Sequence, residues 1–487
     1  MTAFSLTVFR NSAFGMAGQI AIKLLSFVFS VFVIRHLGAE DFGQYAAVMA
    51  FGMVFVSLAD LGLSSYTVRE VARLRDMPDG KNRTAALYGN VLTLRLVLAI
   101  LAALLIIAVA WLTDRPWIMI GAIALNGLSL VMYGAQGASD AVLAGFERLD
   151  LSAGARVLNQ LIFVFGGALF LYWGLGYYGL IYAGLLGVAL MTYVCWRAVS
   201  RLGLRPARPS PSLWLTLLRA SFPFGVIGLA LGWSYKFDSV LLNIYWGDEV
   251  TGYYAAAYNL IFSAVMISNV VNTALYPSLA RQSVKDGHRL PAIYERALRY
   301  LLVIALPIAV GGWVLAEQLV PFLFTASFAP GVPALRILIW VVPLMYVSEF
   351  LGYVVVVAGR ESRVARAVLI STGINVGLNL LLVPLFGFFA AAIMTVLTEA
   401  VLVGQYLWLL RSLLREFNWG QVLLGPLLAA LAMGLGVYLV HSHFSFSLNV
   451  LVGAAIYSVF LFVLGVAGRE EIHFVRGLLA SRLGAAR

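Results

Sequence analysis

The sequence is poor in charged residues and has a single cysteine. Only 11% of the 487 residues are charged and 62% are hydrophobic, whereas soluble domains average about 25% charged and about 45–50% apolar residues. A soluble core of this size is excluded, because single cores stop growing beyond roughly 250–300 residues. Cys195, being alone, forms no intrachain disulfide and no cysteine metal site, so we expect a small buried helix residue. The composition therefore predicts a protein embedded in a lipid bilayer.

The charge that is present is basic, with a net value of +11. The 33 Lys and Arg residues form short clusters between apolar stretches and do not gather on a polar domain. This pattern is typical of membrane orientation signals and argues against a nucleic-acid partner.

Long apolar runs dominate the rest of the chain. A helix needs about 20 apolar residues to cross the bilayer core, and this criterion predicts an all-α polytopic protein with about fourteen transmembrane helices. The first run contains Lys23 and exceeds the apolar region of a signal peptide, so we interpret it as a span. The predicted spans are 14–36, 43–65, 85–111, 117–144, 153–174, 176–198, 219–245, 250–276, 297–320, 335–358, 364–384, 387–410, 422–443 and 447–467.

The distribution of basic residues predicts the orientation of these spans. With both termini in the cytoplasm, the inner segments hold 27 of the 33 Lys and Arg residues, and the outer segments hold only Arg35, Arg115 and Arg336. Such a bias satisfies the positive-inside rule. Two inner segments, 66–77 and 469–483, mix arginine with apolar residues at helical spacing and are predicted to lie on the membrane surface.

Three short motifs recur about 210 residues later, in the same order and at the same loops. Six helices in each half make the halves a parallel repeat around a central cleft, an arrangement suited to alternating access. The predicted domains are a six-helix lobe at 1–212, its repeat at 213–412, two extra helices at 413–468 and an amphipathic tail at 469–487. The matching segments are 38–47 with 247–256, 144–147 with 358–361, and 176–178 with 387–389.

The opening of the chain carries a set of family motifs. They are Asn11, the run IRHLGAEDFG at 34–43, Tyr45, the run ADLG at 59–62, Arg69 and Glu70. With them, residues 10–75 resemble the opening of the polysaccharide-repeat-unit flippases, the O-antigen flippase group of the multidrug/oligosaccharidyl-lipid/polysaccharide (MOP) exporter superfamily. The resemblance extends over both halves, and the helix count agrees with fourteen-helix members.

The resemblance implies a two-lobed exporter that moves polyprenyl-diphosphate-linked oligosaccharides from the cytoplasmic to the outer leaflet. Its sugar would occupy a polar cavity while the lipid tail stays in the bilayer. The implied location is the inner (plasma) membrane of a bacterium or archaeon, and the implied partners are lipid-linked oligosaccharide, membrane lipids and other polysaccharide-assembly proteins. No cofactor or metal is expected, although coupling to H⁺ or Na⁺ is known in the superfamily.

Eight charged residues fall inside predicted spans. At about 3 kcal/mol each, lipid-facing charges would cost roughly 24 kcal/mol, more than the roughly 5–15 kcal/mol that stabilises a typical domain. Most of them must therefore face protein or water. Asp60 and Asp140 lie near the inner ends of their helices and are expected to be solvated or paired there. The other six are Lys23, Arg95, Lys236, Asp238, Glu349 and Glu399.

Two roles are open for the six deeper charges. Lys23, Arg95 and Lys236 are predicted to line the cleft and attract the substrate's diphosphate or acidic sugars, the alternative being structural ion pairs between helices. Asp238 is, with Glu349 and Glu399, a candidate for carrying a coupling proton or sodium ion, since buried carboxylates exchange their counter-ion. A structural role explains these carboxylates equally well.

Two other functions compete with the flippase. A polytopic glycosyltransferase would carry catalytic groups on long outer loops, but the outer loops here are short, the longest being around 325–334, with no cluster of carboxylates or histidines. We therefore predict no catalytic residues. The second alternative is a peptidoglycan lipid-precursor flippase or a multidrug exporter of the same superfamily.

Overall fold

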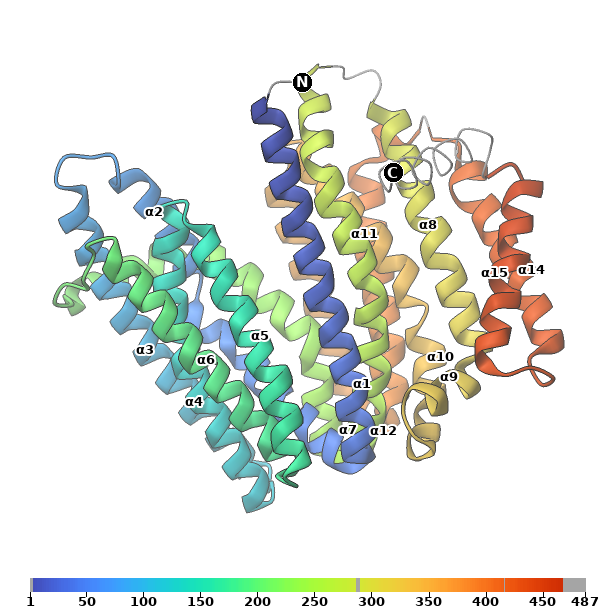
Figure 1. The fold of residues 1–487 in the computed structure, drawn as a ribbon, viewed down its shortest axis with the longest axis horizontal. Coiled ribbons are helices and arrows are strands. Elements are labelled where there is room, and N and C mark those ends of the chain that lie inside the picture. The colour runs from blue at the N-terminus through green and yellow to red at the C-terminus, as the bar shows by residue number, and fades with distance from the viewer. Residues whose placement is uncertain (1–2, 286–289, 416, 467–487) are drawn as a thin grey trace, which may run out of the picture. The chain divides into compact units, whose positions relative to one another are not determined.

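The computed structural model describes residues 3–285, 290–415 and 417–466, and nearly all of them are helical (Figure 1). The predicted all-α class is thereby confirmed. The first half contains α1 (Ala3–Asp60), α2 (Leu63–Leu74), α3 (Gly80–Leu112), α4 (Trp117–Gly145), α5 (Leu149–Tyr172) and α6 (Gly176–Arg201). It is followed by α7 (Trp214–Lys285), α8 (Leu290–Val314), α9 (Ala316–Leu323), α10 (Val332–Leu338), α11 (Val341–Val357), α12 (Glu361–Leu409), α13 (Arg411–Leu414), α14 (Gly425–Val440) and α15 (Phe446–Val463).

Three helices are far longer than one bilayer crossing requires, which is about 20 residues. They are α1, α7 and α12, with 58, 72 and 49 residues. Each contains one glycine with non-helical dihedral angles, at or beside a loop expected between two spans. At Gly38 and Gly247 these angles are nearly the same, with φ 75° and 83° and ψ −177° and −175°. Glycine adopts such positive φ values without the steric cost of a Cβ.

Ten of the described helices are long and apolar enough to cross a membrane, or eleven if the bent pair 326–338 and 341–357 is one span. The three helices with an internal glycine break count once each in this number. The expected total of fourteen stays a prediction.

By packing, the described residues form two compact units. The first comprises 3–256 and 368–391, and the second comprises the described residues of 257–367 and of 392–466. In the first unit, α3, α4, α5 and α6 lie side by side (Figure 1). In the second unit, α14 packs against α8 and α15. The lobe boundaries at 212 and 412 were expected from the repeat alone and stay a prediction.

The first unit holds a reciprocal contact between the corners of α1 and α7. A Cβ atom on Gly43 would lie 1.8 Å from the carbonyl oxygen of Asp248, and a Cβ on Gly252 would lie 2.0 Å from that of Ala39. Gly43 corresponds to Gly252 and Ala39 to Asp248 at the same spacing in the sequence repeat. Contacts in which equivalent residues exchange places are typical of a two-fold axis. We therefore propose that the two halves arose by duplication.

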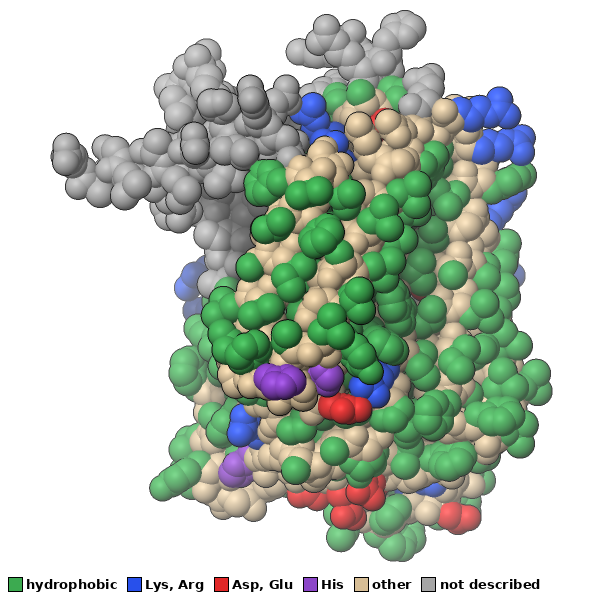
Figure 2. All heavy atoms as spheres, turned by 90° about the vertical axis from the view of Figure 1, so that its right-hand side faces the viewer, with side chains coloured by type: hydrophobic (Ala, Val, Ile, Leu, Met, Phe, Trp, Pro, Cys, Tyr) green, Lys and Arg blue, Asp and Glu red, His purple; other side chains and the backbone are tan. Residues whose placement is uncertain are grey.

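The last two helices present apolar side chains outward. Figure 2 shows hydrophobic side chains over most of this face, with charged groups mainly towards its ends. Only 17% of the most apolar window of α15 is buried, so its outer surface suits lipid. The exposed residues include Leu428, Leu431, Leu435, Leu439, Leu451 and Val459.

The inner segment expected to be amphipathic is helical in α2. The face of α2 that is buried against protein carries Leu63, Thr67 and Val71, and Arg69 is exposed. Whether α2 also lies on the membrane surface stays a prediction. The second such segment, 469–483, lies outside the described residues.

Candidate functional site

Asp60 and Arg95 form an ion pair inside the first unit. Arg95 is 6% exposed, and its Nη1 atom donates to Asp60 Oδ1 and to the Ser64 hydroxyl. Its Nε atom donates to the Gly134 carbonyl at 3.0 Å. The guanidinium is therefore held by groups from α1, α2 and α4, as expected of a buried charge that needs a partner.

The local sequence explains how Asp60 reaches this position. It is the last residue of α1, and its carboxylate accepts the backbone N–H groups of Gly62 at 3.1 Å and Ser64 at 3.2 Å. These donors lie at the start of α2, where a helix has N–H groups without an intrahelical partner. Gly62 has φ 80° and no room for a Cβ, which would lie 2.3 Å from the Ser221 carbonyl oxygen. The ADLG run thus forms a tight corner that orients the carboxylate.

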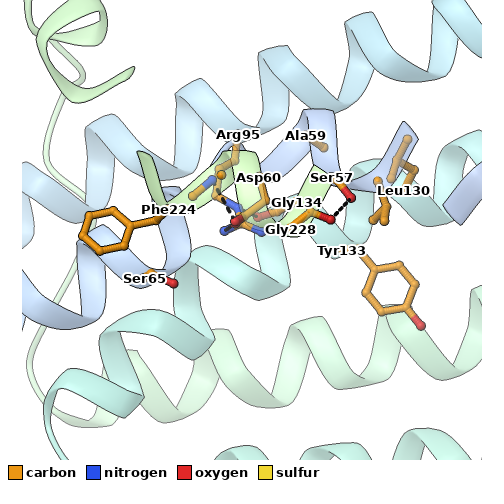
Figure 3. A pocket seen from close by; sticks show the side chains of 13 residues that line it. Ser57, Ala59, Asp60, Ser65, Arg95, Leu130, Tyr133, Gly134, Phe224 and Gly228 are labelled. Atoms are coloured by element: carbon orange, nitrogen blue, oxygen red, sulfur yellow. Dashed lines mark hydrogen bonds and ion pairs between the residues drawn. The ribbon is translucent and has the colours of Figure 1, made fainter. Parts of the chain in front are cut away.

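A cavity of about 290 Å³ adjoins this ion pair (Figure 3). Its wall combines residues of α1, α2, α3 and α4 with Phe224, Gly225 and Gly228 near the start of α7. Besides the ion pair, the polar side chains are those of Ser57, Ser65 and Tyr133. The cavity therefore combines a charged pair and a few polar groups with an apolar wall, among helices long enough to span a membrane.

Lys236 and Asp238 lie close together on α7. Asp238 is 1% exposed and accepts hydrogen bonds from the Tyr254 hydroxyl at 2.5 Å and the Ser239 N–H at 2.7 Å. Tyr254 follows the break at Gly247, so it lies on the second span expected within α7. Lys236 is half-buried and interacts electrostatically with Asp238.

Glu349 and Glu399 lie near each other in the second unit, close enough to interact electrostatically. Glu349 accepts a hydrogen bond from Ser268 at 2.9 Å, and Glu399 accepts one from Ser348. The two carboxylates extend from α11 and α12 and are half-buried. Two neighbouring carboxylates favour the presence of a shared proton or cation between them.

The other charges expected inside spans, Lys23 and Asp140, also have interaction partners. Lys23 is half-buried on α1 and has an interaction partner. Asp140 pairs with Arg156 at 3.2 Å, and Asp60 pairs with Arg95, so both inner-end carboxylates are paired. Arg95 lines a cavity and is also in an ion pair with Asp60, and its predicted attraction of the substrate stays a prediction.

Outside the spans, ion pairs lie in the segments that connect the helices. Arg75 lies 3.0 Å from Glu147, and this hydrogen bond raises the pKa of Arg75. Arg148 lies 3.0 Å from Asp150, and its hydrogen bond lowers the pKa of the Asp150 carboxyl. Such exposed pairs contribute little stability.

The sequence did not identify the hydroxyl and amide groups that surround the charges. These residues are Ser64, Tyr254, Ser268, Asn272 and Ser348. One signal was available, because Tyr254 belongs to the repeated motif at 247–256. In the described part of the chain, no group of three or more His, Cys, Asp or Glu residues forms a metal site.

Comparison with known families places this site in context. A family model described as "Polysaccharide biosynthesis protein" matches residues 8–283, more than half of the 487 residues. The chain belongs to the polysaccharide biosynthesis protein family. A second model, described as MatE, matches residues 223–381 of this family member.

Two archaeal proteins are similar to this polysaccharide biosynthesis protein along most of its length. The probable low-salt glycan biosynthesis flippase Agl15 of Haloferax volcanii is 22% identical over 404 residues, 82% of each chain. An uncharacterized membrane protein of Methanocaldococcus jannaschii, MJ1068, is 21% identical over 427 residues, 80% of this chain and 82% of that protein.

Solved structures show the same fold. The lipid II flippase MurJ in an inward closed conformation has a TM-score of 0.75 at 14% identity, covering 95% of this chain and 98% of that one. An inward-facing MATE-family multidrug transporter of the MOP superfamily has a TM-score of 0.64 at 16% identity, covering 81% and 96%. The predicted membership of the MOP superfamily is confirmed, and this polysaccharide biosynthesis protein is a multi-pass membrane transporter of the flippase type.

Proposed function

We propose that the protein translocates polyprenyl-diphosphate-linked oligosaccharide from the cytoplasmic to the outer leaflet by alternating access. The observation that carries the proposal is the family match over 8–283, together with a relative named as a glycan biosynthesis flippase. The charge-bearing cavity at Asp60 and Arg95 supports it, because a diphosphate headgroup needs polar surroundings inside the bilayer. The inner-membrane location, the cytoplasmic termini and an O-antigen-like sugar are parts of this proposal.

Depletion of the protein from its cells tests the function against the alternatives. We expect lipid-linked oligosaccharide to accumulate on the cytoplasmic leaflet and the matching surface glycan to decline. Accumulation of the peptidoglycan lipid precursor instead would identify a different lipid substrate. An unchanged glycan together with increased sensitivity to small organic cations would contradict the proposal in favour of a multidrug exporter.

Lys23, Lys236 and Arg95 are proposed to attract the diphosphate. Lys23→Ala and Lys236→Ala are expected to slow transport of the lipid-linked sugar roughly ten- to a hundredfold, because each removes a charge-assisted contact worth about 1.5–3 kcal/mol. The measurement is the translocation rate in vesicles, normalised to protein in the membrane. Lys81→Ala, on an exposed inner segment, is the matched control and should transport normally. Full activity in both Lys23→Ala and Lys236→Ala would refute this role.

Asp238 is proposed, with Glu349 and Glu399, to carry the coupling cation. Asp238→Asn and Glu399→Gln keep the side-chain shape but remove the charge that binds a cation. An imposed sodium or proton gradient should accelerate transport by the wild-type protein and have no effect on a variant of the coupling residue. The experiment compares transport rates with and without each gradient, with Glu317→Gln as an exposed carboxylate control. A gradient response retained in Asp238→Asn, Glu349→Gln and Glu399→Gln would exclude these three carboxylates.

A further inference from the structure

A second cavity in the first unit has no charged residue in its wall. Its volume is about 260 Å³, and it lies among α1, α4, α5 and α6. Hydroxyl and amide groups face it together with Phe163 and several aliphatic residues. The polar residues are Tyr45, Asn126, Ser129, Tyr133, Asn159 and Gln160.

Several of these polar groups make no hydrogen bond within the protein. Ser129 is 7% exposed, and neither its hydroxyl nor the Gln160 amide has a hydrogen-bond partner among the described residues. The Tyr45 hydroxyl likewise has no such partner. Buried polar side chains are nearly always hydrogen-bonded, so an unpartnered one calls for a specific explanation. Of the three, Ser129 is buried and Tyr45 and Gln160 are half-buried, and all three line the same cavity.

This neutral cavity adjoins the charged one. Tyr133 contributes to the walls of both, and it comes directly before Gly134, whose carbonyl accepts from Arg95. Figure 3 shows the Tyr133 ring pointing away from the Asp60–Arg95 pair. A ligand with an anionic part and a neutral polar part joined directly to it would therefore find both environments next to each other.

We propose that the neutral cavity binds one uncharged sugar ring of the lipid-linked oligosaccharide. Ring hydroxyls and acetamido groups both donate and accept hydrogen bonds, which matches the unpartnered Ser129 hydroxyl and Gln160 amide. The apolar face of the ring suits the aromatic surface of Phe163 and Tyr45. The volume lies just below the roughly 300–1,000 Å³ of sites for drug-sized ligands, which suits one ring.

Because the wall of this cavity carries no charged residue, it is unfavourable for a phosphate group or an organic cation. A phosphate or an organic cation moved into this cavity would lose its hydration without gaining a counter-charge. The inference rests on the proposed function, because it assigns the sugar of that substrate to a particular set of residues.

The test compares two lipids that differ only in the sugar. One probe is polyprenyl diphosphate carrying a single N-acetylhexosamine, and the other is polyprenyl diphosphate without a sugar. Both dissociation constants are measured on the purified full-length protein in a detergent without a sugar headgroup. The double variant Ser129→Ala/Gln160→Met removes the two unpartnered polar groups, keeps their approximate size and breaks no hydrogen bond within the protein.

The wild-type protein should bind the glycosylated lipid more tightly than the bare one. The double variant should lose about tenfold in affinity for the glycosylated lipid, as expected for two lost hydrogen bonds, and bind the bare lipid unchanged. Unchanged binding of the bare lipid also shows that the variant is folded. The control Ser200→Ala/Gln421→Met, outside both cavities, should behave as wild type.

Two different failures are distinguishable. If the wild-type protein binds both lipids but the double variant retains the sugar preference, the neutral cavity does not hold the sugar and the proposed function stands. If the wild-type protein binds neither lipid, the proposed function fails and this inference fails with it.

Discussion

Gly43→Ala and Gly252→Ala should each lower the thermal unfolding midpoint markedly, with a loss of about 3 kcal/mol, the upper end for overpacking. In both cases the added Cβ would fall within 2.0 Å of a backbone carbonyl oxygen. A backbone carbonyl does not swing aside as a flexible side chain does, so the α1 and α7 corners must separate. The measurement is the fraction of detergent-solubilised protein that remains monodisperse after heating.

Gly154→Ala is the matched control. Gly154 is a helical residue of α5, and nothing lies within 4 Å of the position its Cβ would take. This variant should unfold at the wild-type temperature or higher, since replacing an unhindered glycine typically adds about 0.4–1 kcal/mol. If Gly43→Ala and Gly252→Ala unfold like Gly154→Ala, the close corner contact does not exist in the folded protein.

Asp60→Asn is expected to destabilise the protein by about 3 kcal/mol, the lower end for breaking a buried ion pair. The change leaves the Arg95 guanidinium, 6% exposed, without its counter-charge. The lower end applies because the Asp60 side chain is 33% exposed and water screens part of the loss. Thermal unfolding of the purified variant measures the effect.

Two further variants make this second prediction specific. The double variant Asp60→Asn/Arg95→Met should recover part of the loss, because no uncompensated charge remains buried. Glu317→Gln breaks the exposed pair with Arg336, whose side chains are 67% and 35% exposed, and should cost about 1 kcal/mol or less. A double variant that is no more stable than Asp60→Asn would contradict an ion-pair explanation.

The sequence alone predicted the all-helical fold, and it placed loops at or beside the glycines where α1, α7 and α12 break, because bilayer thickness imposes a length on each apolar run. Gly38 and Gly247 fall in repeated motifs and adopt nearly the same backbone conformation. The second pair of matching segments, 144–147 and 358–361, shows a limit of inferring the repeat from residue identity. The left-handed residues in these segments are Glu147 and Gly359, 212 residues apart, whereas the identical residues match at a spacing of 214. Conformation aligns these turns better than residue identity.

The pairing of side chains was harder to predict. Asp60 and Arg95 were both identified as charges inside spans, but their pairing depends on how α1 and α3 are rotated, which composition does not determine. Arg95 was grouped with Lys23 and Lys236 by charge alone. The neutral cavity was missed for another reason, because Ser129 and Gln160 are uncharged and only charged residues mark themselves as costly inside a span.

The central claim is that this protein moves a lipid-linked sugar between leaflets. Its most direct test is the purified protein in vesicles loaded with polyprenyl-diphosphate-linked oligosaccharide, with a membrane-impermeant reagent that modifies only sugars in the outer leaflet. In vesicles that contain the protein, the fraction of modified sugar should rise over time from about half to nearly all. In protein-free vesicles with the same lipid, this fraction should stay near one half. A fraction that remains near one half in protein-containing vesicles, with and without an imposed cation gradient, would contradict the claim.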